Sequence, residues 1–133
     1  MGTRALIHIK DSSLDSPTLV TIYRQYDGYM SGLGKDILKA LNMGDCYIVN
    51  GIEQQSDDTL RFNGMGCLAA YLISKLKKEI GNVYIYPTDS IDCGEEYTYT
   101  LYVCNGSLNC TVSAYGELIE HGSLHEHFFT KND

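Results

Sequence analysis

Alternation of hydrophobic and polar positions predicts two strands at the beginning of the chain. Over residues 4–10 an apolar side chain occupies every second position, as in a strand with one buried face. Residues 18–26 follow a polar loop and are rich in β-branched and aromatic side chains, which favour strands. We expect an antiparallel hairpin in which Arg24 continues the apolar row of Val20 and Ile22. An arginine in such a row must be paired or must lie where the sheet edge opens into a site.

A helical period replaces this alternation in two later segments. Residues 35–41 predict a short helix that ends before Gly44. The clearest helix runs from Asn63, a candidate amino-terminal cap, to Ile80, with apolar residues at three- and four-residue steps. Gly81 then supplies a carboxyl-terminal stop. The sequence therefore predicts two helices.

Further strands are predicted around and after the long helix. Residues 46–52 form one candidate strand, followed by a polar loop at 53–59, and residues 83–86 form another. The dipeptide Asn105-Gly106, between two alternating runs, is typical of a hairpin turn. With a two-residue turn there, one register makes every pair on one face apolar, and that face becomes the core face. The pairs are Val103 with Leu108, Leu101 with Cys110, Tyr99 with Val112 and Tyr97 with Ala114.

The order of these elements predicts an α+β fold. Two strands, a short helix, a candidate strand, a long helix and at least three more strands suit an antiparallel sheet with two helices packed on one face. The chain has 133 residues, 44% of them hydrophobic, which suffices for one core but not for two ordinary domains. We predict a single domain over residues 1–133, with residues 117–133 as a candidate carboxyl-terminal arm that completes the core or docks on another subunit.

Charge and cysteine content narrow the function classes. Ten Lys and Arg residues against 17 Asp and Glu residues give a net charge of -7, which disfavours binding to a nucleic-acid duplex. The cluster Lys75, Lys77 and Lys78 is typical of a solvated helix face. No apolar run approaches the roughly 20 residues that span a bilayer, and no secretory signal pattern opens the chain, so we expect a soluble, cytoplasmic protein that binds no membrane. Five cysteines without a Cys-x-x-Cys pair predict reduced, mostly buried thiols, no structural zinc and no cofactor.

Candidate chemistry is concentrated in residues 23–36, where a predicted strand passes through three glycines into a predicted helix. Arg24 offers a planar fork of donors suited to phosphate or carboxylate. Tyr26 and Tyr29 offer faces on which a base can stack, and Asp27 can accept from a ribose hydroxyl. Free amides at the helix start can hold an anion. The candidate ligand-binding residues of this segment are Arg24, Tyr26, Asp27, Gly28, Tyr29, Ser31, Gly32, Gly34 and Lys35.

An ordinary structural role is the alternative for the same segment. Asp27-Gly28 then forms a turn, and Arg24 pairs with Asp27 or Glu95. The tyrosines fill core and sheet positions, because 11 tyrosines in one chain guarantee some clusters. Both interpretations are compatible with the sequence.

A second glycine-rich helix entry spans residues 63–67. Free amides at the start of the helix can bind an anion, so Asn63, Gly64 and Gly66 are further candidate ligand-binding residues. This entry and the first could face one cleft. The alternative is that both glycines allow tight packing of the helix against the sheet, and that Cys67 is a buried thiol rather than an activated one.

Two clusters of ionisable residues remain. The acidic segment Asp89–Glu96 could hold a divalent cation or supply paired carboxylates for acid-base catalysis, and the alternative is a polar loop before a strand. Three histidines and two glutamates within residues 120–127 match no defined zinc motif, which favours an exposed acidic tail. We expect no metal site, and we favour a protein without a catalytic set.

Three short motifs invite a comparison with a group of known sequences. They are Met1-Gly2-Thr3-Arg4, Tyr23-Arg24-Gln25-Tyr26-Asp27-Gly28-Tyr29 and Asp92-Cys93-Gly94-Glu95-Glu96-Tyr97-Thr98-Tyr99. In these motifs the chain resembles a group of small uncharacterised bacterial and phage proteins. Met30 stands where the resemblance leads us to expect proline, which makes the turn less rigid. No activity is established for the group, so the resemblance implies no mechanism, and a phage origin would place the protein in the host cytoplasm.

Three function classes follow, of which we favour the first. It is a passive binder of an anionic, nucleotide-like small molecule, such as a phage protein that sequesters a host immune signalling nucleotide. The second is a small hydrolase or phosphodiesterase that uses Asp89–Glu96. The third is a non-catalytic virion or interaction module. Because a chain this small builds a deeper pocket between copies, we also expect a homo-oligomer.

Overall fold

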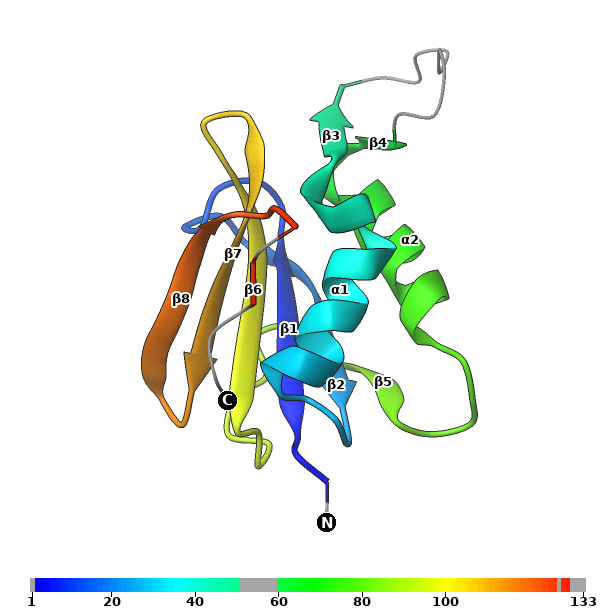
Figure 1. Ribbon diagram of the computed structural model, residues 1–133, viewed down its shortest axis with the longest axis vertical. Coiled ribbons are helices and arrows are strands. Elements are labelled where there is room, and N and C mark those ends of the chain that lie inside the picture. The colour runs from blue at the N-terminus through cyan, green and yellow to red at the C-terminus, as the bar shows by residue number, and fades with distance from the viewer. Residues whose placement is uncertain (1, 51–59, 127, 130–133) are drawn as a thin grey trace.

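The main feature of the computed structural model, which describes residues 2–50, 60–126 and 128–129, is a six-stranded sheet. Its strands are β1 (Ala5–Lys10), β2 (Thr18–Arg24), β5 (Val83–Tyr86), β6 (Tyr97–Cys104), β7 (Ser107–Ala114) and β8 (Glu117–Ser123). They follow the order β5-β2-β1-β6-β7-β8, and every neighbouring pair is antiparallel except β1 with β6. Both helices pack on one face of this sheet (Figure 1). The predicted α+β class is therefore confirmed, with one parallel pairing at the centre of the sheet.

The two predicted hairpins are present. Strands β1 and β2 pair antiparallel, with Ala5 opposite Arg24. Strands β6 and β7 pair in the predicted register along their whole length. In the turn between them, Asn105 and Gly106 adopt φ values of 52° and 78°, as a two-residue hairpin with the right-handed strand twist requires. Local periodicity thus predicted both hairpins, and the chemistry of the Asn105-Gly106 turn also predicted the register of β6 with β7.

Two helices and two shorter helical turns form the layer over the sheet. They are a π-helical turn η1 (Met30–Gly34), α1 (Lys35–Ala40), a 3-10 turn η2 (Asn42–Gly44) and α2 (Gly64–Leu76). Helix α2 ends one turn before the predicted Ile80, which is fully exposed and has no apolar contact to hold a further turn. Instead, the Lys77 ammonium donates to the backbone oxygens of Gly81 and Val83 at 2.9 Å. Neither helix is long and apolar enough to cross a bilayer, within the residues that the structure describes.

A two-stranded parallel sheet lies beside the amino-terminal end of α2 (Figure 1). It consists of β3 (Cys46–Val49) and β4 (Leu60–Asn63). Strand β3 confirms the strand predicted from residue 46, and the predicted loop at 53–59 lies outside the described residues. Strand β4 leads directly into α2 and was missed, because four residues are too few to show a strand period.

The core lies between the sheet and the helices and includes Phe128 and Phe129, which follow β8. After β8 the chain returns to the core, where Phe128 and Phe129 are each 2% exposed. The Phe129 ring packs edge-on against Tyr99 with 5.7 Å between centroids. Burial of a large apolar side chain contributes about 1.5–3 kcal/mol, so these two residues tie the segment after β8 to the fold. The segment that begins at Glu117 therefore supplies both a strand and core residues.

Candidate functional site

A cavity of about 300 Å³ opens between the end of β2, α1 and the carboxyl-terminal end of α2. The segment from Lys78 to Val83 completes its wall. Ala40 and Leu76 contribute apolar atoms, while most of the other wall residues are polar or charged. The volume is at the lower end of the range for ligand pockets, which is about 300–1,000 Å³. The cavity therefore suits a small molecule.

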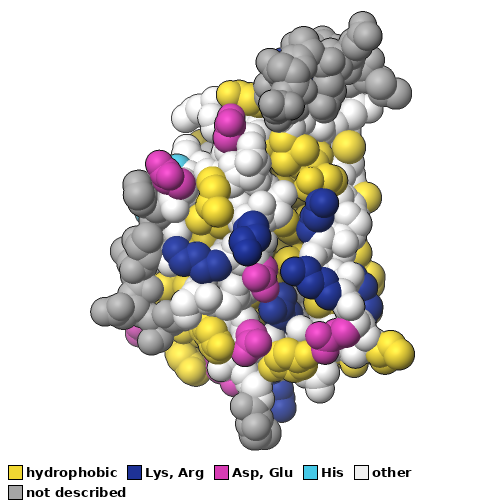
Figure 2. All heavy atoms as spheres, turned by 45° about the vertical axis from the view of Figure 1, so that its right-hand side comes forward, with side chains coloured by type: hydrophobic (Ala, Val, Ile, Leu, Met, Phe, Trp, Pro, Cys, Tyr) yellow, Lys and Arg dark blue, Asp and Glu magenta, His cyan; other side chains and the backbone are white. Residues whose placement is uncertain are grey.

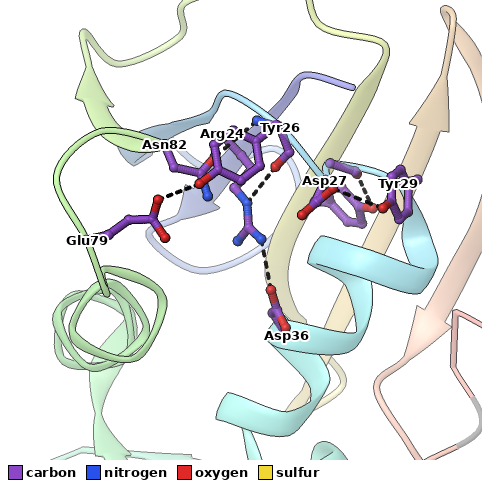
Figure 3. Close-up of polar contacts among 9 residues, drawn as sticks. Arg24, Tyr26, Asp27, Tyr29, Asp36, Glu79 and Asn82 are labelled. Carbon is purple, nitrogen blue, oxygen red and sulfur yellow. Dashed lines mark hydrogen bonds and ion pairs between the residues drawn. The ribbon is translucent and has the colours of Figure 1, made fainter. Parts of the chain in front are cut away.

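Arg24, the last residue of β2, lines this cavity with a side chain that is 9% exposed. Its Nε donates to the backbone oxygen of Tyr26, and its Nη2 donates to Asp36 Oδ2 on α1, both at 2.9 Å (Figure 3). Arg24 is thus paired and also lies beside the cavity. Its partner is Asp36, and not Asp27 or Glu95 as the structural alternative predicted. Within the described residues these contacts use two of the five N–H donors of the guanidinium, which leaves others for a ligand.

Tyr26 is held in the cavity wall from two directions. Its backbone N–H donates to Asn82 Oδ1 at 3.0 Å, and its phenol donates to Glu79 Oε2 (Figure 3). The bond to Glu79 raises the pKa of the Tyr26 phenol, because it stabilises the protonated form. Asn82 has a φ of 65°, and the backbone N–H of Gln25 donates to its carbonyl at 2.7 Å. The segment after α2 is therefore fastened to the end of β2, which sets the position of the Tyr26 ring.

Positive charge gathers at this cavity although the protein as a whole is acidic. Lys39 on α1, together with Lys75 and Lys78, lines the wall beside Arg24. Four of the 10 Lys and Arg residues of the chain thus surround one cavity, against a net charge of -7. Figure 2 shows Lys and Arg side chains grouped on this face of the molecule, with acidic side chains among them. A local field of this sign attracts anions.

Among the described residues the three lysines of the wall form no ion pair, and Lys75 lies over the Tyr71 ring, with 5.2 Å between its Nζ and the ring centroid. Asp36 and Glu79 already accept hydrogen bonds from wall residues, and Asp27 accepts one from outside the wall. In the described ranges, neither Lys39 nor Lys78 makes an ion pair or a hydrogen bond. Their exposed ammonium groups are therefore available to neutralise a bound anion.

Tyr29 and Ser31 lie outside the cavity wall. The Tyr29 phenol donates to Asp27 Oδ1 at 2.9 Å, and the side chain lies on the opposite side of Asp27 from Tyr26 (Figure 3). Together with Ser31, Tyr29 lines a separate shallow hollow. The structure thus brings Arg24, Tyr26 and Asp27 together at the cavity and places the second predicted tyrosine elsewhere.

Packing requires two of the three glycines of the first candidate segment, Gly28 and Gly32, and leaves little room at the third, Gly34. A Cβ added at Gly28 would lie 2.7 Å from the Cβ of Ala5, which real structures do not tolerate. At Gly32 it would lie 2.5 Å from a backbone oxygen, and at Gly34 it would lie 3.0 Å from an aromatic ring. Lys35 is exposed on α1, and the cavity wall does not include it. The glycines position the loop, and none of them lines the cavity.

The second candidate segment lies at the far end of α2 from Lys75, and the cavity wall includes none of its residues. The 13 residues of α2 separate the two ends by about 20 Å. No atom of the described residues outside their own immediate chain neighbours lies within 4 Å of a Cβ added at Gly64 or Gly66, so the alternative of tight packing at these glycines is wrong. Asn63 precedes the first helical residue but makes no capping bond through its side chain. Cys67 is exposed, so the expectation of a buried thiol there is also wrong.

Sequence reasoning missed six polar residues of the wall, which are Asp36, Lys39, Lys75, Lys78, Glu79 and Asn82. The sequence shows Lys75 and Lys78 as part of a cluster. The end of β2, which lines the same cavity, is about 50 residues away in the sequence, so no local pattern connects it with the lysines. The chain matches no family model, no curated protein and no solved structure. The function must therefore be argued from the geometry of the site.

The acidic segment Asp89–Glu96 uses its carboxylates to hold the backbone. Glu95 accepts from the backbone N–H groups of Asp92 and Cys93, and Glu96 accepts from the backbone N–H of Arg4. No group of three or more His, Cys, Asp or Glu side chains in the described part of the chain is arranged to hold a metal ion. These contacts match the polar-loop alternative for the segment.

The cysteines are free thiols in different environments. Only Cys46 and Cys110 are buried, so the prediction of mostly buried thiols is wrong. Burial raises the pKa of Cys46 to about 11 and also raises the pKa of Cys110, which makes both poor nucleophiles at neutral pH. Cys67 and Cys104 are exposed and lie outside the cavity wall.

Proposed function

We propose that this protein binds a small anionic, nucleotide-like molecule in the cavity between β2, α1 and α2. The observation that carries the proposal is the gathering of Arg24, Lys39, Lys75 and Lys78 around about 300 Å³ on a chain of net charge -7. Packing does not account for this arrangement, because the three lysines are exposed and exposed charges contribute little to stability. The four cationic side chains would bind and neutralise an anionic ligand.

Different residues of the wall bind different parts of the proposed ligand. The unused donors of Arg24 suit two oxygens of a phosphate, and the ammonium groups of Lys39 and Lys78 balance its charge. The Tyr26 ring forms a flat wall against the body of the ligand. Asp27 offers a carboxylate to ribose hydroxyls. All these groups belong to one chain, so the proposed binding requires no second copy.

Passive binding fits the wall better than catalysis. A general acid or base needs a carboxyl group that is free to exchange a proton with the ligand. Each carboxylate of the wall already accepts a hydrogen bond: Asp36 from Arg24, Glu79 from the Tyr26 phenol and Asp27 from the Tyr29 phenol. A protein that retains its ligand, as one that sequesters a signalling nucleotide would, needs no such group. We therefore propose a binder and not a hydrolase.

A thermal-shift panel of mono-, di- and cyclic nucleotides, with inorganic phosphate and pyrophosphate, tests the proposal. A ligand at 100 times its dissociation constant should stabilise the fold by about 2.7 kcal/mol. Lys78→Glu should abolish the shift, because it replaces a free wall cation by an anion. Lys35→Glu is the matched control, since it makes the same charge change outside the wall and should retain the shift.

Three results would contradict the proposal. The first is the absence of a shift with every compound of the panel. The second is equal loss of the shift in the two charge-reversal variants, which would indicate a non-specific effect of net charge. The third is conversion of the bound nucleotide, measured by chromatography after incubation, which would favour the hydrolase.

A further inference from the structure

Two hairpin turns of the sheet share one backbone conformation but not one sequence. The turn between β6 and β7 has Asn105 at φ 52° followed by Gly106 at φ 78°. The turn between β7 and β8 has Tyr115 at φ 53° followed by Gly116 at φ 83°. Asparagine tolerates a positive φ because its short polar side chain bonds locally, whereas a bulky aromatic residue there is a genuine outlier. The second turn therefore carries strain that the first avoids.

The fold does not compensate the strain at Tyr115. Its side chain is 76% exposed, so the ring gains little from burial. Its backbone N–H donates to the carbonyl of Glu96 at 2.7 Å, but any residue other than proline would make that bond. The ring does contact Tyr97, in a tilted arrangement with 6.3 Å between centroids. Strained positions that bring the fold no gain are typical of functional sites.

The Tyr115 ring lines a hollow of about 320 Å³ whose chemistry differs from that of the cavity. Tyr29 and Tyr97 add two more phenol rings, and Thr3 and Ser31 add hydroxyl groups. Among the described residues, none that lines this hollow is charged. Aromatic faces with neutral donors and acceptors suit a planar, uncharged, polar ring such as a nucleobase, and they do not suit a phosphate.

Asp27 connects this hollow with the cationic cavity. Its carboxylate lines the cavity and also accepts the phenol hydrogen bond of Tyr29, which lines the hollow. In Figure 3, Tyr29 and the cavity residue Tyr26 lie on opposite sides of Asp27. From the cavity to the hollow, the side chains are therefore first the cations, then the Asp27 carboxylate and then the tyrosine rings. A nucleotide has the matching order of phosphate, ribose hydroxyls and base.

We propose that the Tyr115 hollow is the base-binding subsite of a nucleotide whose phosphate lies in the cationic cavity and whose ribose contacts Asp27. This inference rests on the proposed function and assigns an end of the ligand to each hollow. It also explains why tyrosine occupies the strained position 115. An aromatic ring at the turn between β7 and β8 can stack on one face of a bound base.

Titration calorimetry with pyrophosphate and with AMP, GMP, CMP and UMP tests the assignment. Tyr115→Asn should lower the affinity for the preferred nucleotide about tenfold, as expected for a lost stacking partner, and leave pyrophosphate affinity within twofold. The same variant should melt about 2–4 °C higher than the wild type, because asparagine relieves the strain. Asn105→Tyr, the reciprocal change in the matched turn, should melt lower and bind nucleotides as the wild type does.

The outcomes separate the two proposals. Wild-type nucleotide affinity in Tyr115→Asn, or a melting temperature no higher than that of the wild type, overturns the base-binding subsite. Equal losses of pyrophosphate and nucleotide affinity in that variant overturn it as well. Wild-type protein that binds pyrophosphate but gains nothing from any base refutes the subsite and leaves the anion cavity standing. Wild-type protein that binds none of the five compounds refutes the subsite, and the absence of a thermal shift across the wider panel refutes the anion cavity as well.

Discussion

The two glycine-rich helix entries of this protein look alike in sequence and differ completely in their surroundings. Gly28 and Gly32 are crowded, with positions for a Cβ that fall within 3 Å of neighbouring atoms. Gly64 and Gly66 are open: in the described part of the chain, no neighbouring atom lies within 4 Å of a Cβ added at either position. The first entry needs glycine because other parts of the chain occupy the space. The comparison teaches that a glycine-rich entry by itself does not indicate a ligand.

The crowded entry nevertheless matters for the candidate site. The backbone N–H of Gly28 donates to the carbonyl of Thr3 at 2.9 Å, and the Tyr99 phenol donates to the carbonyl of Gly28 at 2.7 Å. These bonds fasten the loop that carries Tyr26 and Asp27 to the central strands. The open entry lies at the other end of α2 and positions no wall residue. The segment around Gly28 therefore holds the loop that carries two wall residues, and the segment at residues 63–67 is remote from the cavity.

Gly28→Ala gives the largest expected effect. The added methyl group would lie 2.7 Å from the Cβ of Ala5 and 2.9 Å from the backbone oxygen of Thr3, so a central strand must shift. We expect the free energy of unfolding to fall by about 2–3 kcal/mol, measured by urea denaturation. A loss below 0.5 kcal/mol would contradict the view that the first entry is packed.

Asp36→Ala tests the ion pair that ends the crowded segment. It leaves the nearly buried Arg24 guanidinium without its carboxylate, but the Asp36 side chain is 44% exposed, so solvent softens the loss. We expect a destabilisation of about 1–2 kcal/mol in the same assay. Lys35→Ala, one residue away on an exposed position, should change stability by less than about 0.5 kcal/mol and serves as the control. Equal effects of the two changes would show that the pair contributes nothing.

Gly64→Ala isolates backbone conformation from packing in the open entry. Its φ of +82° is costly for any residue with a Cβ, although no atom would clash with the methyl group. A destabilisation of about 1 kcal/mol is expected. Thermal unfolding followed by circular dichroism provides the measurement, and an unchanged melting temperature would argue against this conformation.

Gly66→Ala should have the smallest effect and the opposite sign. The residue lies in the first turns of α2, is exposed, and has a φ that does not require glycine. Alanine is the better helix former, so we expect a stabilisation of about 0.5–1 kcal/mol. A destabilised Gly66→Ala variant would reveal a role for this glycine that the open surroundings do not show. The melting temperatures of the two open-entry variants can be compared directly.

The motifs of the sequence carried more structural than functional information. The Met-Gly-Thr-Arg start and the later Asp-Gly-Tyr motif meet in space, since a Cβ added at Gly2 would touch the side chain of Tyr26. The acidic motif joins them, because the backbone N–H of Glu96 donates to the carbonyl of Arg4 at 2.9 Å. Three segments that are remote in the chain thus form one end of the sheet. Whether they also mark a protein family stays a prediction.

The sequence by itself determined the two helices, most of the strands and the register of β6 with β7, because periodicity and the Asn105-Gly106 turn act between residues that are close in the chain. Only the tertiary structure decided that Arg24 pairs with Asp36, that Lys39 and Lys78 share a cavity with it, and that one glycine entry is crowded and the other open. These properties depend on which helix end docks on which strand end. Tyr26 and the Asn82 side chain that holds it are 56 residues apart, and no local pattern encodes such a distance.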